Sequence, residues 1–144
     1  MRAFLFSIIL VALCAFVSAC ATGGGGGPDK VIYHFDSGLP QATKGLRNIG
    51  NHLEVNPSAR IVAITHAQGV DFLMKGAKDQ NGNKYEDTVE QLANRGVTFQ
   101  VCEITLRNRN LARDQFIAEV SYVPSGVAEI AKLQQREGYA YLKP

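Results

Sequence analysis

The run Arg60-Ile61-Val62-Ala63-Ile64-Thr65-His66 is almost continuously apolar and predicts a buried strand. A strand that is apolar at successive positions is covered on both faces, which is typical of a parallel sheet flanked by helices. Outward from this run, β-branched and aromatic stretches predict further strands at 30–35, 97–102, 117–123 and 139–142. Helical segments separate these strands, so the sequence indicates an α/β fold with a mostly parallel sheet and right-handed crossovers.

The helices are marked by apolar spacing and by signals at their ends. A helix that starts near Pro40 carries one apolar stripe, and further helices are predicted at 70–75, 85–95 and 103–109. Ser125 is placed to cap a helix through residue 136, with Gly138 as its stop. This last helix is expected to bury Val127, Ile130, Ala131 and Leu133.

Composition narrows the class of protein. The chain has 144 residues, of which 46% are hydrophobic and 19% charged, and its formal net charge is +2. This length supports one hydrophobic core of ordinary size, and the apolar content excludes a disordered chain. Balanced charges, without clustered lysine and arginine, argue against nucleic-acid binding. We therefore expect one folded domain that does not bind nucleic acid.

Residues 1–19 have the layout of a secretory signal peptide, with Arg2, an apolar stretch and then small residues. Val17-Ser18-Ala19-Cys20 resembles a bacterial lipobox, in which a peptidase cuts before the cysteine and Cys20 carries acyl chains. Two alternatives stay open at this point. The segment 3–22 is almost long enough to be an uncleaved transmembrane anchor, and an ordinary secretory signal would leave Cys20 as the first mature residue.

A glycine-rich stretch follows and predicts a flexible tether over residues 20–29, so that the folded domain spans 30–144. Several acyl chains together hold a protein stably at a membrane. Ala21 follows the lipidated cysteine, and by the bacterial sorting rule this residue, unlike aspartate, favours the outer membrane. The expected location is therefore the periplasm, with the domain lipid-anchored to a membrane, more specifically the outer one.

Cysteine usage draws attention to Cys102. The chain has three cysteines. Cys14 would leave with the signal peptide and Cys20 would be lipidated, so that Cys102 remains as a lone thiol in an oxidising compartment. Such a cysteine is a reactive thiol, an intermolecular bridge, a ligand or a small buried hydrophobe.

Cys102 ends a predicted strand and begins a predicted helix. Ligands of open parallel sheets bind beyond the carboxyl ends of the strands. That edge is predicted to carry 34–36, 65–68, Cys102 and 123–125. A helix N-terminus with Arg107, Arg109 or Arg113 in range favours a thiolate, although Glu103 opposes it. We take Arg107 as the candidate thiolate stabiliser.

Three stretches then carry a family likeness: Phe99-Gln100-Val101-Cys102-Glu103-Ile104-Thr105-Leu106, Val123-Pro124-Ser125-Gly126-Val127-Ala128-Glu129-Ile130 and Gly138-Tyr139-Ala140-Tyr141-Leu142-Lys143-Pro144. With them, residues 30–144 resemble the DsrE/DsrF-like family. The resemblance implies a three-layer α/β/α sandwich with a five-stranded sheet in a flavodoxin-like arrangement, and symmetric homo-oligomers. It also implies sulfur transfer through a cysteine persulfide, and it places Cys102 at the position of the sulfur-carrying cysteine. Thr105 and Leu106 match the surroundings of that cysteine without an assigned chemistry.

The familiar sulfur carriers of this family are cytoplasmic, whereas this chain carries an export signal by the argument above. The leading hypothesis is therefore a periplasm-facing, lipid-anchored sulfur carrier that exchanges sulfane sulfur on Cys102 with an unknown donor or acceptor protein. Such a protein would be closer to a sulfurtransferase-like relay than to a turnover enzyme. His66 is the candidate base that would assist Cys102.

Other interpretations of the same residues stay open. One is a non-catalytic, oligomeric binding or assembly module with a buried Cys102. Another is a metal-binding protein in which Cys102 joins His34 and His66, although no local ligand spacing supports it. Asp36 is a candidate catalytic carboxylate that turn formation explains equally well. No Gly-x-Gly-x-x-Gly motif follows a strand, so no dinucleotide cofactor is expected.

Overall fold

The structure is a computed structural model, and it describes residues 27–144. The predicted signal peptide, Cys20 and most of the tether lie outside the described residues. Five strands form one parallel sheet in the order β4-β3-β2-β1-β5, which confirms the predicted α/β fold. The strands are β1 (Lys30–Phe35), β2 (Arg60–Thr65), β3 (Thr98–Cys102), β4 (Val120–Val123) and β5 (Ala140–Leu142).

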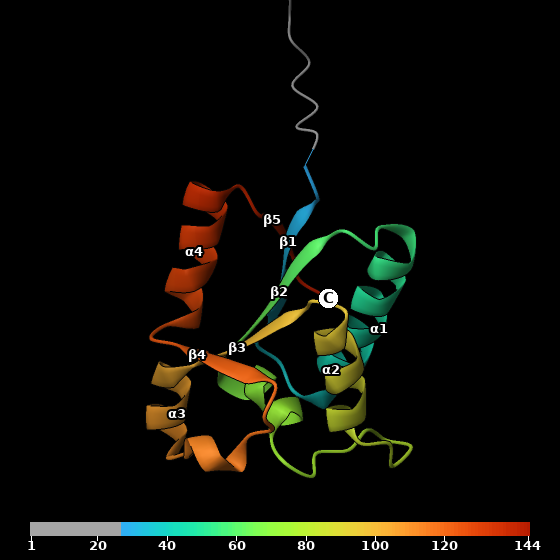
Figure 1. Ribbon diagram of the computed structural model, residues 1–144. Helices are drawn as coiled ribbons and strands as arrows, with labels where there is room; N and C mark the ends of the chain where they lie inside the picture. Colours follow the sequence, from blue (N-terminus) through green and yellow to red (C-terminus); the bar gives the residue numbers. More distant parts are fainter. Residues whose placement is uncertain (1–26) are drawn as a thin grey trace, which may run out of the picture.

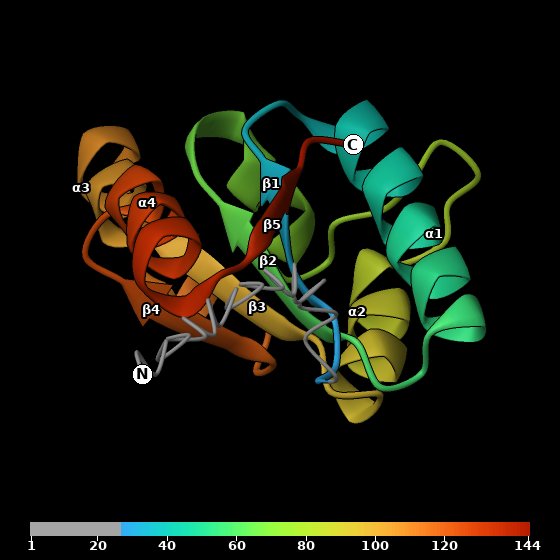
Figure 2. The same cartoon turned by 90° about the horizontal axis from the view of Figure 1, so that it is seen from above.

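Helices cover both faces of this sheet and give the three layers visible in Figures 1 and 2. The α-helices are α1 (Leu39–Val55), α2 (Tyr85–Asn94), α3 (Glu103–Arg109) and α4 (Gly126–Glu137), and short 3₁₀ helices are η1 (Ala67–Leu73) and η2 (Arg113–Gln115). None of the helices within 27–144 is long and apolar enough to cross a membrane.

The order of the strands explains where α4 lies. From β1 to β4 the chain moves across the sheet in one direction, and right-handed crossovers place α1 and α2 on one face. The return from β4 to β5 runs the opposite way, so its crossover helix α4 lies on the other face (Figure 2). Because all five strands are parallel, they end at the same edge of the sheet.

Alternating side chains of the central strands fill two cores. On the α1 and α2 side, Val31, Tyr33 and Phe35 of β1 pack with the apolar stripe of α1, which consists of Ala42, Leu46, Ile49 and Leu53. On the α4 side, Ile32, Val62 and Ile64 pack against Ile130 and Leu133. This two-sided burial confirms the double-faced strands that the apolar runs predict.

The predicted buried face of the last helix is partly wrong. Ile130 and Leu133 are buried as expected, but Val127 is 60% exposed and Ala131 is also exposed. The contacting stripe of α4 is Gly126, Ile130 and Leu133, at intervals of four and three residues. Val127 and Ala131 each follow a residue of this stripe by one position and are exposed. Gly126 has no side chain, so the hydrophobic pattern of the sequence does not show that it belongs to the stripe.

Two other elements differ from the prediction by more than one residue. The fourth strand begins at Val120 instead of Ile117, because Ile117 N–H donates to Leu73 O and Phe116 forms an isolated bridge with Met74. These bonds hold the segment against η1 and away from the sheet. The short helix predicted at 70–75 is the 3₁₀ helix η1, which begins immediately after β2.

Candidate functional site

Cys102 is the last residue of β3 and the N-cap of α3, as the sequence predicts. It pairs in register with Val123 of β4, so it lies at the carboxyl edge of the sheet beside the β4–α4 turn. Cys102 is 4% exposed. The parallel topology thus brings the strand end and the start of two helices, α3 and α4, to one place.

Hydrogen-bond donors surround the Cys102 sulfur. The backbone N–H groups of Gly126, Thr105 and Ile104 and the Thr105 hydroxyl lie near it, and each of them lowers the pKa of the Cys102 thiol. Burial alone raises the pKa of the Cys102 thiol, but these donors stabilise the thiolate, and the resulting pKa lies below its ordinary value. This arrangement favours a nucleophilic sulfur at near-neutral pH.

Gly126 approaches Cys102 closely because it lacks a side chain. A Cβ atom built on Gly126 would lie 3.3 Å from Cys102 Cβ and 3.5 Å from His66 Cβ. The first distance is shorter than most carbon–carbon contacts, and the second is at the lower end of their ordinary range. The glycine therefore lets the first N–H of α4 approach the cysteine, and both Cys102 and His66 lie close to the same turn.

Thr105 also supports the neighbouring strand connection. Its Oγ1 atom accepts a hydrogen bond from Ala67 N–H at 2.9 Å, while Arg109 Nη1 donates to Ala67 O at 2.8 Å and to Asp71 Oδ1 at 2.6 Å. Ala67 has φ of 49°, in the left-handed region that residues other than glycine seldom adopt. Such strain persists where surrounding contacts impose it, and it concentrates at functional sites.

A pocket of about 530 Å³ opens over Cys102. It is lined by His66, Ala67, Gln68, Cys102, Ile104, Thr105, Asn108, Arg109, Ser125 and Val127. His66, the candidate base, therefore shares a pocket with Cys102. Arg107, the candidate thiolate stabiliser, is exposed and is not among the lining residues, whereas Arg109 is.

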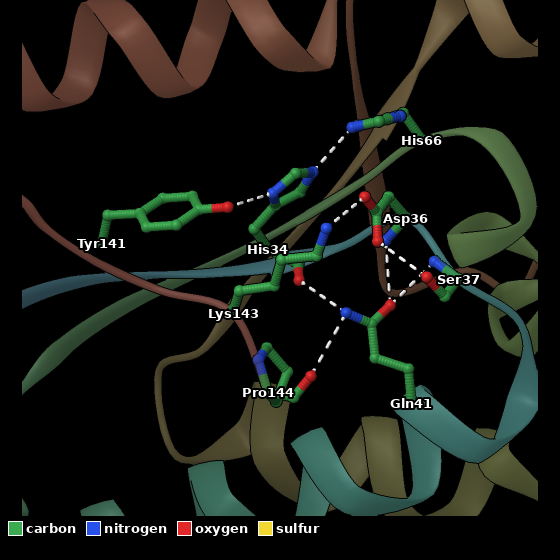
Figure 3. A network of polar contacts seen from close by, with 8 residues as sticks. All are labelled: His34, Asp36, Ser37, Gln41, His66, Tyr141, Lys143 and Pro144. Carbon is green, nitrogen blue, oxygen red and sulfur yellow. Dashed lines mark hydrogen bonds and ion pairs between the residues drawn. The ribbon is translucent and has the colours of Figure 1, made fainter.

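A second polar group adjoins this pocket through His66. His34 Nε2 and His66 Nε2 lie 2.6 Å apart, and His34 Nδ1 lies 2.6 Å from the Tyr141 hydroxyl (Figure 3). Lys143 Nζ lies 2.6 Å from Asp36 Oδ2. Ligand atoms of His34, Asp36 and His66 all fall within 4.8 Å of one another, and Cys102 is not part of this set.

These groups shift one another's protonation. Burial lowers the pKa of His34 and His66, and the proximity of His66 lowers that of His34 further. Burial raises the pKa of Asp36, but the hydrogen bonds from Lys143 and Ser37 and the nearby positive charges together outweigh it, so the net pKa lies below its usual value. At neutral pH the cluster therefore holds neutral imidazoles beside a carboxylate, which are the protonation states that bind cations.

Comparison with known proteins identifies the family. The model of the DsrE/DsrF-like family matches residues 30–144. The chain belongs to the DsrE/DsrF-like family. The fold and the family resemblance predicted from the sequence are thereby confirmed, whereas the role of Cys102 stays a prediction. No curated protein matches the chain.

Two solved structures share this DsrE-like fold. One is MTH1491 of Methanobacterium thermoautotrophicum, a protein of unknown function, with 29% identity and a TM-score of 0.72 over 81% of this chain and 99% of that one. The other is the ychN protein of E. coli, with 15% identity and a TM-score of 0.65 over 82% of this chain and 99% of that one. The likeness to ychN concerns the fold alone.

Several site residues were not predicted. Gly126 and Thr105 lie in the stretches that carry the family likeness, but their spacing in the sequence does not predict an interaction with the cysteine sulfur. Tyr141 and Lys143 come from the C-terminal strand and its extension, far along the chain from His34 and Asp36. Only the position of β5 beside β1 brings them together.

Proposed function

We propose that this DsrE-like chain carries sulfane sulfur as a persulfide on Cys102 and relays it between partners. The observation that carries the proposal is the set of N–H and O–H donors around a cysteine that lines an open pocket. Membership of the DsrE/DsrF-like family supports the same chemistry. Thiolate character and access are the properties on which persulfide formation depends.

The loading step requires no external oxidant. The Cys102 thiolate attacks the terminal sulfur of a donor persulfide R–S–SH, a new S–S bond forms, and the donor S–S bond breaks. The bonding pair leaves with the donor sulfur, so that the products are Cys102–S–SH and R–S⁻. The proton stays on the transferred sulfur, and atoms and charge balance. Unloading is the same exchange in reverse, with an acceptor thiolate as the attacking group.

His66 would assist this exchange, and its presence in the same pocket as Cys102 supports this role. In its neutral form it accepts the thiol proton when Cys102 arrives protonated. Its lowered pKa keeps that neutral form dominant at neutral pH. We therefore assign His66 the role of base and Cys102 that of nucleophile and sulfur carrier.

The location and partners of the protein belong to the same proposal. The lipobox-like sequence that ends at Cys20 supports a lipid anchor, with the domain held in the periplasm at the outer membrane. The sulfur donor and acceptor are then periplasmic proteins or small thiols, and the family supports a homo-oligomer. Labelled fatty acid that is incorporated into the wild type but not into Cys20→Ser would test the anchor.

Sulfur loading is tested by intact mass measurement after exposure to polysulfide. The full-length chain carries Cys14→Ser and Cys20→Ser, so that Cys102 is the sole thiol, and the control adds Cys102→Ser. We expect one added sulfur that a reductant removes, present with Cys102 and absent in the control. Equal sulfur on both proteins, or none on the folded protein that has Cys102, would refute the proposal.

A second candidate function rests on the 4% exposure of Cys102. If the thiol is structural, the domain is a non-catalytic binding module, and the exposed apolar side chains Ile104 and Val127 beside the pocket would contact its partner. Alkylation of the native protein separates the two candidates. Fast labelling of Cys102 at neutral pH favours the sulfur carrier, and slow labelling favours the binding module.

A further inference from the structure

We propose that His34, Asp36 and His66 form a binding site for a first-row divalent transition-metal ion, with Zn²⁺ as the reference ion. This proposal differs from the sulfur carrier function because Cys102 is not one of the ligands, and His66 would bind the ion in place of acting as a base. Ligand atoms of the three residues converge within 4.8 Å at the carboxyl edge of β1 and β2. The residues come from two neighbouring strand ends, so the fold itself creates the convergence.

The two histidines of the site face each other in close contact. Their Nε2 atoms face each other at 2.6 Å, and the ring centroids lie 4.7 Å apart. In neutral imidazoles, one of two facing nitrogens must carry the proton and only the other offers a lone pair. A cation between the nitrogens would use both lone pairs, after the modest separation that a metal–nitrogen distance of about 2.0–2.1 Å requires.

Tyr141 orients the His34 ring for metal binding. Its Nδ1 atom lies 2.6 Å from the Tyr141 hydroxyl, and the residue is 8% exposed. A hydrogen bond from Nδ1–H to a neighbouring oxygen fixes the tautomer and leaves the Nε2 lone pair free for a metal, as is usual for metal-bound histidine. Figure 3 shows Tyr141 on one side of the His34 ring and His66 on the other.

The chemistry of the donors indicates the class of ion. Two imidazole nitrogens and one carboxylate suit zinc, cobalt, nickel and copper better than calcium or magnesium, which prefer oxygen ligands alone. Three protein ligands also leave a coordination position for water or another ligand. Because His66 lines the Cys102 pocket as well, the ion would lie at the border of that pocket.

Lys143 competes with the ion for Asp36. Its ammonium group lies 2.6 Å from Asp36 Oδ2, where it balances the charge of the carboxylate. The Lys143 side chain is 47% exposed, so it can move into solvent when a cation binds. The Lys143→Met variant is therefore expected to bind the metal more tightly than the parent protein.

The test uses the full-length chain with Cys14, Cys20 and Cys102 all replaced by serine, which removes every thiolate ligand. Zn²⁺ binding is measured by calorimetry and Co²⁺ binding by its visible absorption. We expect one ion per chain, no sulfur-to-cobalt charge-transfer band, and loss of binding in His66→Gln and Asp36→Asn. Tyr141→Phe should weaken binding by roughly tenfold or more.

His52→Gln is the matched control, since His52 lies on α1 and its Nδ1 contacts the Tyr33 hydroxyl, outside the site. Circular dichroism verifies that each variant is folded, and the half-buried His66 and Asp36 are preferred to buried His34 for this reason. Absence of binding in the thiol-free parent, unchanged binding in His66→Gln, equal losses in His52→Gln, or unchanged or weaker binding in Lys143→Met would overturn the assignment.

Discussion

Thr105 acts on Cys102 through two groups, because both its backbone N–H and its hydroxyl lower the pKa of the cysteine thiol. The same hydroxyl oxygen accepts from Ala67 N–H at 2.9 Å and so connects α3 to the strained turn after β2. One side chain therefore supports the thiolate and shapes the wall of its pocket.

Thr105→Val keeps the size of the side chain and removes the hydroxyl. The loss of a hydrogen bond to a charged sulfur, worth about 1.5 kcal/mol, should lower the thiolate population roughly tenfold. We expect alkylation of Cys102 at pH 7 to slow by that factor. Arg107→Gln is the control and should leave the rate unchanged, since Arg107 does not line the pocket. Similar rates for both variants would contradict the assignment.

The rate of Cys102 alkylation should depend on pH with a shifted midpoint. The donors around the sulfur place the pKa of the folded thiol below its ordinary value, so the thiolate forms at lower pH than in the unfolded chain. The rate therefore rises with pH, and the midpoint of the rise lies below that of a free cysteine, whose pKa is about 8.5. The same chain in denaturant, with Cys102 as its only thiol, supplies the reference. A folded midpoint at or above the unfolded one would contradict this account.

Gly126→Ala tests the close approach of α4 to the cysteine. The added methyl group would lie 3.3 Å from Cys102 Cβ, so the turn must shift and weaken the N–H donation from residue 126. We expect slower alkylation and a loss of stability of about 1 kcal/mol. Gly50→Ala on α1 is the matched control, because its methyl group meets nothing within 4 Å.

The control variant should keep its alkylation rate and gain roughly 0.5–1 kcal/mol of stability from helix propensity. Urea unfolding measures both stabilities. A Gly126→Ala variant that reacts as fast as Gly50→Ala would show that the glycine has no part in activating the thiol.

The revised face of α4 is tested by two substitutions. Ile130 is 8% exposed and packs against the sheet, so Ile130→Ala should cost about 2–4 kcal/mol. Val127 is 60% exposed, and Val127→Ser should change stability by no more than about 0.5 kcal/mol. Denaturant unfolding of both variants measures these changes in stability. A larger loss of stability in Val127→Ser would show that Val127 belongs to the buried face, as the hydrophobic spacing predicts.

Much of the fold follows from local patterns in the sequence. The continuously apolar strand at 60–66, the stripe of α1 and the cap at Ser125 each predict an element that the structure contains. These features are local, since a few consecutive residues determine them. The contact face of α4 was mispredicted because its first contact is Gly126, which hydrophobic spacing does not mark.

The site was only partly predictable for a related reason. Parallel topology predicts that the ends of β1, β2, β3 and β4 meet, and this alone places Cys102 near His66. The place of Tyr141 and Lys143 depends on β5 pairing with β1, which no short stretch of sequence encodes. The groups that lower the pKa of Cys102 include backbone N–H groups, which every residue type except proline supplies. The charge of Arg107 makes it a candidate thiolate stabiliser, but charge does not indicate which side of a short helix faces the pocket.

The most direct measurement of the central claim is the release of sulfur from Cys102. The chain in which Cys102 is the only thiol is loaded with polysulfide, desalted and treated with cyanide, which takes the outer sulfur of a persulfide as thiocyanate and leaves the thiol. The account predicts close to one thiocyanate per chain, a second full load after regeneration, and none from the Cys102→Ser control. A folded protein that releases no thiocyanate, or releases as much without Cys102, would contradict the claim that this cysteine relays sulfur.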